Sequence, residues 1–248
     1  MESKARYLQI ADDLRRRIKA GEFPVGARIP SRAELSKHYE VAPPVATRVL
    51  QILVAEGLVE SRPGAGAFVL PPPERVQLSR AWYREVRGGS PFAGDMEAQG
   101  KVPSWRVHSR TDVASADVAQ RLAIAEGGPV MRTVYVYTAD GVPVQRAVSY
   151  EPYELTRGTP IALPEDGPHA GRGVRNRMAV IGVTVTHRRE ALHSRGATVE
   201  EARDLGISPG AVVTVLRRTY VADDRPVETC DIVAPGDRVE FVYVLDVN

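Results

Sequence analysis

Apolar residues near the start of the chain recur every three or four positions, which is the spacing of one face of an α-helix. Charged residues fill the positions between them, and Gly21 and Pro24 mark where the pattern stops. The pattern predicts an amphipathic helix whose apolar face consists of Tyr7, Ile10, Ala11, Leu14 and Ile18.

Two more short helices and a hairpin are predicted before residue 70. Ser31 stands three residues before Glu34, a capping-box spacing that starts a helix running to about His38. Pro43 and Pro44 start the next helix, because first-turn N–H groups have no partner within a helix. Two apolar runs around residues 63–66 then predict a β-hairpin. The buried stripe of the third helix is expected to be Ala46, Val49, Leu50 and Leu53, and Gly57 closes that helix.

Three short helices followed by a hairpin indicate a winged helix-turn-helix, in which the third helix enters the major groove and the hairpin forms a wing. The hydrophobic pattern alone also fits a small helical domain of another kind. Three consecutive prolines at 71–73 form a stiff, extended segment. We therefore place a winged helix-turn-helix domain at 1–70, a proline-rich linker at 71–78 and an α+β domain at 79–248.

The second domain contains an internal repeat. Sliding residues 115–145 by 83 positions onto 198–228 gives ten identities in 31 positions without a gap. Each copy reads as a capped helix, a strand, a tight turn and a second strand. Two such units are expected to pair as one antiparallel sheet with helices on one side and a cleft between the copies. Recurrent α+β patterning without common packing is the alternative.

Composition and charge change this picture little. The chain has 248 residues, 43% hydrophobic and 26% charged, and residues 1–70 carry a mild excess of positive charge. No apolar stretch approaches the ~20 residues that span a bilayer, and the chain starts without the apolar core of a secretory signal. We expect a cytoplasmic protein with no membrane partner.

Catalytic and metal-binding motifs are missing from the sequence. One cysteine, Cys230, excludes an internal disulfide and a cysteine-built zinc site, and it is expected to be a small buried strand residue rather than a nucleophile. His169, His187 and His193 lack metal-ligand spacing, and no nucleophile elbow or phosphate loop is present. We expect no enzymatic activity, no metal and no cofactor.

Particular residues of the first domain resemble the DNA-binding domain of the GntR family. The resemblance covers nearly all of residues 5–70, and its most specific parts are Gly21, Pro24, Gly26, Pro30-Ser31-Arg32, Glu34-Leu35, Glu56-Gly57-Leu58-Val59 and Gly64/Gly66. It implies a winged helix-turn-helix that binds double-stranded DNA. The residues expected to contact DNA are Arg6, Ser31, Arg32, Pro43, Pro44, Val45, Thr47, Arg48, Arg62, Gly64 and Gly66.

One stretch departs from the family. Members usually start the recognition helix with a Ser/Thr–Arg pair whose arginine reads a guanine, and this chain has Ala42 and Pro43 there. A family arginine one turn later is replaced by Thr47. Readout is therefore expected to shift to Arg32, Thr47, Arg48 and the wing, with apolar contacts from Pro44 or Val45 to thymine methyls. The arginines at 15–17 are expected on a solvated helix face.

The second domain resembles the UTRA effector-sensing domain of the HutC branch of GntR regulators. The resembling segments are GDMEAQGKVPSWRV, ADGVPV, Ser149-Tyr150, TVEEARDLGISPGAVV and RPVE with GDRVEF. The resemblance implies a chorismate-lyase-like fold, a homodimer and a pocket for a small molecule. The expected effector-binding residues are Tyr135, Tyr137, Ser149, Tyr150 and Glu228.

The two tyrosines stand where sugar-phosphate binders of the family carry arginines. Tyrosines suit stacking and single hydrogen bonds, so we expect a flatter and less anionic ligand. The alternative is that both are ordinary sheet residues.

These observations together predict a transcription regulator, a repressor like most relatives, that binds an inverted-repeat operator as a homodimer and responds to a small-molecule effector. Two alternatives remain open. One is a ligand-free plasmid or transfer regulator whose second domain only dimerises, and the other is a chorismate-lyase-like enzyme.

Overall fold

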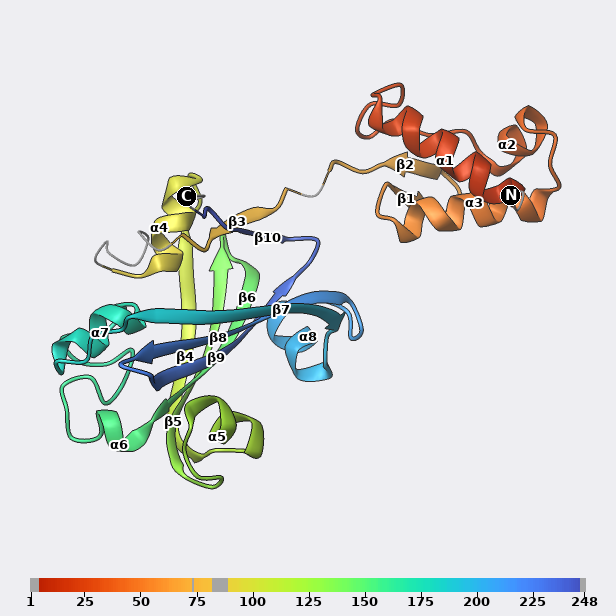
Figure 1. The fold of residues 1–248 in the computed structure, drawn as a ribbon. Helices are drawn as coiled ribbons and strands as arrows, with labels where there is room; N and C mark the ends of the chain where they lie inside the picture. The colour runs from red at the N-terminus through yellow and green to blue at the C-terminus, as the bar shows by residue number, and fades with distance from the viewer. Residues whose placement is uncertain (1–4, 73, 82–88, 246–248) are drawn as a thin grey trace. The chain divides into compact units, whose positions relative to one another are not determined.

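The computed structural model describes residues 5–72, 74–81 and 89–245, and the chain divides into two compact units, Met1–Glu74 and Arg75–Asn248 (Figure 1). In the first unit three helices precede a two-stranded antiparallel hairpin, which confirms the predicted winged helix-turn-helix. Its elements are α1 (Arg6–Lys19), α2 (Arg32–His38), α3 (Pro43–Ala55), β1 (Val59–Arg62) and β2 (Gly66–Val69).

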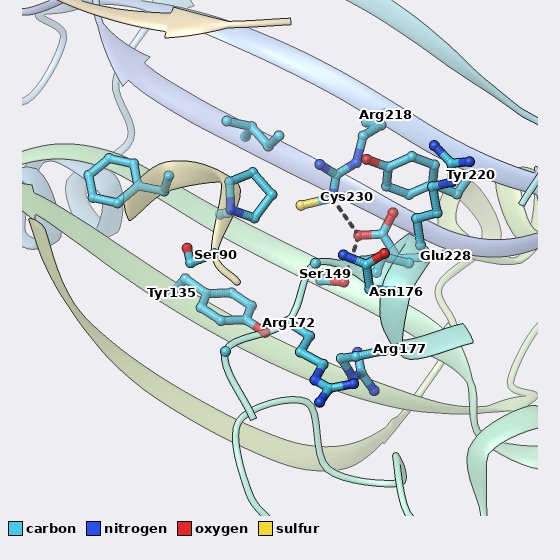
Figure 2. A pocket seen from close by; sticks show the side chains of 18 of the residues that line it. Ser90, Tyr135, Ser149, Arg172, Asn176, Arg177, Arg218, Tyr220, Glu228 and Cys230 are labelled. Atoms are coloured by element: carbon cyan, nitrogen blue, oxygen red, sulfur yellow. Dashed lines mark hydrogen bonds and ion pairs between the residues drawn. The ribbon is translucent and has the colours of Figure 1, made fainter. Parts of the chain in front are cut away.

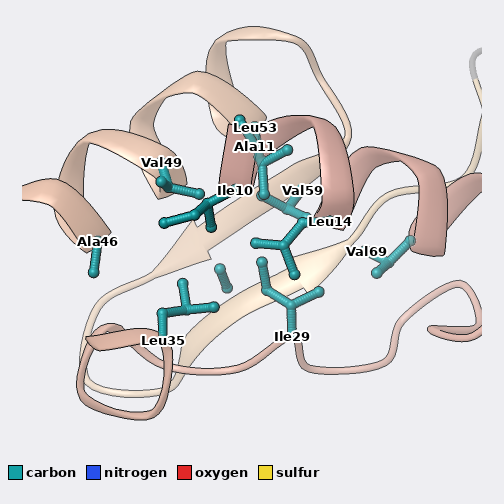
Figure 3. Close-up of a cluster of buried hydrophobic side chains, with 11 residues drawn as sticks. Ile10, Ala11, Leu14, Ile29, Leu35, Ala46, Val49, Leu53, Val59 and Val69 are labelled. Atoms are coloured by element: carbon teal, nitrogen blue, oxygen red, sulfur yellow. The ribbon is translucent and has the colours of Figure 1, made fainter. Parts of the chain in front are cut away.

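The apolar faces predicted from the sequence meet in one core (Figure 3). Leu14 from α1, Leu35 from α2 and Leu53 from α3 are each at most 1% exposed. Ile29 precedes α2 and packs in the same cluster as Val59 and the two strands of the wing. The capping box at Ser31 and Glu34 forms as predicted, with each side chain accepting a hydrogen bond from the other residue's backbone N–H.

The second unit is built on a six-stranded antiparallel sheet with the order β4-β5-β6-β9-β8-β7, beside a small parallel pair of β3 and β10. This architecture confirms the α+β class. The strands are β3 (Val76–Ser79), β4 (Pro103–Val113), β5 (Pro129–Ala139), β6 (Val142–Pro152), β7 (His187–Gly196), β8 (Val212–Ala222), β9 (Arg225–Pro235) and β10 (Val239–Val242). The helices are α4 (Pro91–Ala98), α5 (Ala116–Leu122), α6 (Tyr153–Thr156), α7 (Val174–Val180) and α8 (Val199–Leu205).

The boundary between the units lies earlier than the sequence suggested. Residues 71–78 were expected to form the linker, but Val76–Ser79 is strand β3 and pairs in parallel with Val239–Val242. Val76 and Leu78 are buried against α4, so the second unit begins at Arg75. Their alternation with exposed Gln77 is the period of a half-buried strand, which the adjacent prolines obscured.

The internal repeat is a repeat of structure. β5 and β8, β6 and β9, and α5 and α8 have bounds that differ by 83 residues at both ends. The two hairpins turn at Asp140-Gly141 and Asp223-Asp224, all with positive φ, and each has a register shift just before its turn. Val148 pairs with Asp231, its own counterpart, so a local two-fold axis passes through the centre of the sheet.

Both repeat helices cover the same face of the sheet, as predicted. Arg121 on α5 donates a hydrogen bond to Asp231, and Glu200 in the first turn of α8 accepts one from Arg146. Asp231 and Arg146 share a face because Asp231 lies opposite Val148, two residues from Arg146. The other face is left to α4, to α6 and α7 and to the segment between the two copies (Figure 1).

Helix α8 starts with a second capping box, whose pH dependence is testable. Hydrogen bonds from Arg195 and from the Thr198 backbone lower the pKa of Glu201 to about 2. A carboxylate with a lowered pKa stabilises the fold above its unfolded pKa of about 4.3 and loses that contribution as the pH falls towards 2. We expect the stability difference between the wild type and Glu201→Gln to shrink over this range in urea unfolding at pH 7, 4 and 3. A constant difference would contradict this assignment.

Candidate functional site

The surface predicted to bind DNA is formed by α2, α3 and the wing. Of its predicted members, the exposed ones are Arg6, Arg32, Pro43, Pro44, Arg48, Arg62 and Gly64, and the partly buried ones are Ser31, Val45, Thr47 and Gly66. Arg32 forms no ion pair with any described residue, which leaves its guanidinium available to a phosphate or a base edge. The structure thus places these residues on accessible elements of the first unit, and their contacts with DNA stay a prediction.

Two of the arginines on this surface are held by aromatic rings. The guanidinium of Arg48 lies 5.0 Å from the centre of the Tyr7 ring, and that of Arg62 lies 4.5 Å from the Phe68 ring. Such cation–π contacts orient a long side chain without consuming its N–H donors. Arg62 also donates from Nε and Nη2 to Oε1 of Glu60, whereas Arg48 forms no ion pair with a described residue. The arginines at 15–17 form ion pairs with Asp12, Glu56, Asp13 and Glu22.

The wing depends on its glycines for conformation and for space. Gly64 and Gly66 have φ of +73° and +113°, which side chains rarely adopt. A Cβ at Gly66 would lie 3.0 Å from Nε of Arg28. Turn geometry therefore already accounts for both glycines, and their close approach to DNA stays a prediction.

A pocket of about 110 Å³ lies on the sheet face opposite α5 and α8 (Figure 2). Strands β5, β6, β8 and β9 form its floor, and α4 and the segment around α7 line the rest. Four of the five predicted effector residues line it: Tyr135, Tyr137, Ser149 and Glu228. Tyr135 and Tyr137 are two residues apart on β5 and therefore point to the same face of the sheet. The strand register places Ser149 of β6 and Glu228 of β9 on that same face.

Tyr150 is the predicted effector residue that the structure does not bring to this pocket. Side chains alternate along β6, so Tyr150 lies on the helix-covered face and packs against the cluster around α5. Its neighbour Ser149 takes the pocket position. The sequence pair Ser149-Tyr150 thus splits between the two faces of the sheet.

Glu228 is a fully buried carboxylate at the centre of the pocket floor. Its Oε1 accepts hydrogen bonds from Ser149 Oγ at 2.8 Å and from Arg218 Nη2 at 2.9 Å. The Arg218 guanidinium also lies 4.5 Å from the Tyr220 ring centre. Burial lowers the pKa of Arg218, but coulombic attraction to Glu228 and the hydrogen bond to it outweigh burial and raise that pKa, so the guanidinium stays protonated.

Arg218 is a pocket residue that the sequence prediction missed. It stands 83 residues after Tyr135 and is its counterpart in the second copy of the repeat. Gln145 and Glu228 correspond in the same way, and all four line the pocket. At these two pairs of positions the first copy supplies neutral side chains and the second copy supplies charged ones. Extending the repeat alignment to pocket positions would have found Arg218.

The aromatic side of the pocket is a stack. The rings of Tyr135 and Tyr137 lie 5.4 Å apart with an angle of 9° between their planes. Phe92 of α4 packs at 4.7 Å from Tyr137. Burial raises the pKa of both tyrosines, so their hydroxyls remain protonated. Cys230 is buried and its pKa is raised by burial, which fits the predicted packing role rather than a reactive thiol.

An ion pair joins α7 to the pocket floor. Arg177 donates from Nη1 to Oε1 of Glu151 at 2.7 Å and from Nη2 to Oε2 at 3.2 Å, and it also donates to the Ile161 carbonyl at 2.6 Å. Both side chains are 2% exposed. Burial raises the pKa of Glu151 against the opposing effect of Arg177.

Two further arginines line the pocket, and neither was predicted. Arg172 is exposed and Arg175 is half-buried, and neither forms an ion pair with a described residue. Glu165 is held by Trp105 Nε1 at 3.4 Å and by the Gly171 N–H at 3.2 Å, and burial raises its pKa. Arg172, Arg175 and Glu165 lie in the segment between the two copies of the repeat and belong to no recognisable motif, so only the fold shows that they line the pocket.

Three residues that line the pocket each have a buried polar atom without a hydrogen-bond partner among the described residues. The atoms are Nε of Arg177, Nε of Arg218 and Oε2 of Glu228. Buried polar atoms are nearly always paired, and an orphan calls for water or a ligand. The polar groups of the residues that line this pocket are thus not all paired within the described part of the protein.

Comparisons with known proteins agree with this geometry. The model for bacterial regulatory proteins of the gntR family matches residues 6–69, and the UTRA domain model matches residues 98–240. The chain belongs to the GntR family. A crystal structure of a GntR-family transcriptional regulator superposes with a TM-score of 0.85 at 39% identity, covering 99% of both chains. The regulator therefore combines a GntR head with a UTRA domain.

Two relatives of this GntR regulator are named as repressors. The transcriptional repressor NagR of Bacillus subtilis (strain 168) is 27% identical over 97% of this chain and 94% of its own length. The histidine utilization repressor of Pseudomonas putida is 27% identical over 94% of this chain and 88% of its own. No helix within the described residues has the length and apolar character to span a bilayer.

Proposed function

We propose that this GntR regulator is a repressor that binds an inverted-repeat operator as a homodimer and changes its affinity for that operator when a small molecule occupies the UTRA pocket. The observation that carries the effector role is that Arg177, Arg218 and Glu228, which line one pocket, each keep a buried polar atom without a partner among the described residues. An inert dimerisation domain would be expected to bury apolar side chains there instead. With operator DNA as its partner, the protein works in the cytoplasm.

The pocket favours an effector with a flat part and an anionic part. The stacked tyrosines suit a planar group, and Arg172 and Arg175 are cations without an ion-pair partner among the described residues. A pocket of about 110 Å³ limits the buried part of the ligand to about the size of a single ring. Arg172 and Arg175 give the pocket more positive charge than was expected from Tyr135 and Tyr137, which stand where other family members carry arginines.

The pocket is proposed to bind its ligand without turnover. Its one thiol, Cys230, is buried with a raised pKa, and its buried acids Glu151 and Glu228 each accept a hydrogen bond from an arginine. In the described part of the chain, no His, Cys, Asp or Glu side chains cluster as a metal site requires. Effector binding then changes the affinity for DNA, because the two states of the dimer bind the effector with different affinities.

The test starts with binding of the full-length protein to its own upstream intergenic DNA by gel shift, followed by a metabolite screen that scores release of that DNA. A specific, salt-weakened complex released by one compound class supports the proposal. A specific complex that no compound affects favours the alternative, a regulator whose second domain only dimerises. Non-specific, weak binding would overturn the proposed function.

We expect Arg175→Ala to lower the affinity for the released compound at least tenfold while leaving DNA binding without effector unchanged. The reason is the loss of one charge-assisted hydrogen bond, worth about 1.5–3 kcal/mol. Arg132→Ala is the matched control, because Arg132 is also a half-buried arginine but lies on the opposite face of the sheet. Isothermal titration of both variants measures the effect. Equal losses in the two variants would contradict the assignment of the pocket.

A further inference from the structure

The first turn of the recognition helix α3 has lost its hydrogen-bond donors. Pro43 and Pro44 have no backbone N–H, and the N–H of Val45 is bonded to the Ala42 carbonyl at 2.9 Å. The hydroxyl of Thr47 donates to the Pro43 carbonyl at 3.0 Å. Within residues 43–47, therefore, neither the backbone nor a side chain has a free proton to offer to a base or a phosphate.

The same turn presents an apolar surface instead. Ala42, Pro43 and Pro44 are exposed, and Val45 and Thr47 are partly exposed. Proline rings fix these carbons rigidly, so little side-chain entropy is lost when they are covered. Residues at the start of a recognition helix lie against base edges in the major groove.

We propose that this turn selects thymine in the operator by contact with its C5-methyl group, and that it does not read guanine. The thymine methyl is the apolar group that the major groove presents, whereas guanine offers two acceptors that need a donor. The oxygen of Thr47 keeps its lone pairs and accepts a hydrogen bond from the N6 amino group of the paired adenine. The inference rests on the proposed function only in requiring that the first unit binds operator DNA.

Hydrogen bonds to the bases are expected from residues one turn further along α3. Pro44, Thr47, Arg48 and Gln51 are spaced by three or four residues on the face opposite the buried Val49 and Leu53. Arg48 is oriented by the Tyr7 ring and keeps its donors, and Gln51 is exposed. The operator half-site is therefore expected to place thymine next to the bases that Arg48 and Gln51 contact.

The experiment is a selection of binding sites from a random duplex pool with the full-length protein, followed by methyl replacement in the selected half-site. Deoxyuridine in place of thymidine removes one methyl and leaves every hydrogen-bonding edge intact. We expect binding to weaken about fourfold for each contacted methyl, the factor that corresponds to about 0.8 kcal/mol. In a cytosine-substituted site, 5-methylcytosine should recover a similar factor over cytosine.

The double variant Ala42→Thr with Pro43→Arg restores the pair that most GntR members carry. We expect it to select guanine at the position where the wild type selects thymine, and its response to deoxyuridine should fall below twofold. Arg16→Ala is the matched control, because Arg16 is exposed on α1 and paired with Asp13 away from α3. That variant should keep the wild-type site and the wild-type deoxyuridine effect. Circular dichroism confirms that each variant is folded.

Two results would overturn the proposal. One is a selected half-site with guanine or no preferred base opposite the first turn, and the other is a selected thymine whose deoxyuridine replacement leaves binding unchanged. Both leave the proposed function standing, because specific DNA binding is retained. Failure to select any sequence would instead overturn the proposed function together with this inference.

Discussion

Replacing Arg177 with methionine is expected to lower the free energy of unfolding of the second unit by about 3–5 kcal/mol, the largest effect of any single change considered for this unit. The substitution leaves the Glu151 carboxylate 2% exposed and without its bidentate partner. It also removes the hydrogen bond to the Ile161 carbonyl, which fixes the segment between the two copies of the repeat. Urea unfolding followed by circular dichroism measures the change.

The double variant Glu151→Leu with Arg177→Met separates loss of the charge pair from loss of packing. Replacing both partners with apolar groups leaves no buried charge, so we expect most of the stability to return. A single variant that loses less than about 1 kcal/mol would show that solvent or a ligand reaches Glu151. Because Arg175 lies on α7 and Arg172 just before it, the single variant should also weaken effector binding.

Leu53→Ala is expected to destabilise the winged helix-turn-helix by about 2–5 kcal/mol, enough to abolish operator binding at moderate temperature. Leu53 is fully buried where α1 and α3 meet, and a unit of this size has little other core to compensate (Figure 3). Operator affinity by gel shift and thermal unfolding measure the two consequences.

The neighbouring residue supplies the control. Val54 lies on the same helix and is 40% exposed, so Val54→Ala should change stability by less than about 0.5 kcal/mol and leave DNA binding intact. Effector binding by the second unit should survive in both variants, because the two cores are separate. Equal effects of the two substitutions would contradict the packing described for α3.

The sequence was most informative where structure is local. Helical spacing, a capping box and a Gly-containing turn depend on residues within one or two turns of each other, and all were placed correctly in the first unit. The repeat could also be detected in the sequence, since two copies of one fold need similar residues at their helix caps, turns and core positions.

The residues predicted to bind the effector coincide only in part with the residues that line the pocket. Tyr135, Tyr137, Ser149 and Glu228 were named from the resemblance to the UTRA domain, and all four line it. Tyr150 was grouped with Ser149 because adjacency in sequence hides the alternation of faces. Arg172, Arg175 and Arg177 were missed because no spacing rule relates an irregular segment to the strands it covers.

By itself the sequence determined the family, the two kinds of domain, the helices and hairpin of the head and the repeat in the UTRA domain, because each is encoded by contacts between near neighbours or by self-similarity. Only the tertiary structure decided that the two repeat copies meet at Val148 and Asp231, that β3 pairs with β10, and that arginines from a separate segment face stacked tyrosines across one pocket. Those pairings are set by packing between distant segments. Their energy depends on shape and burial that no local pattern records.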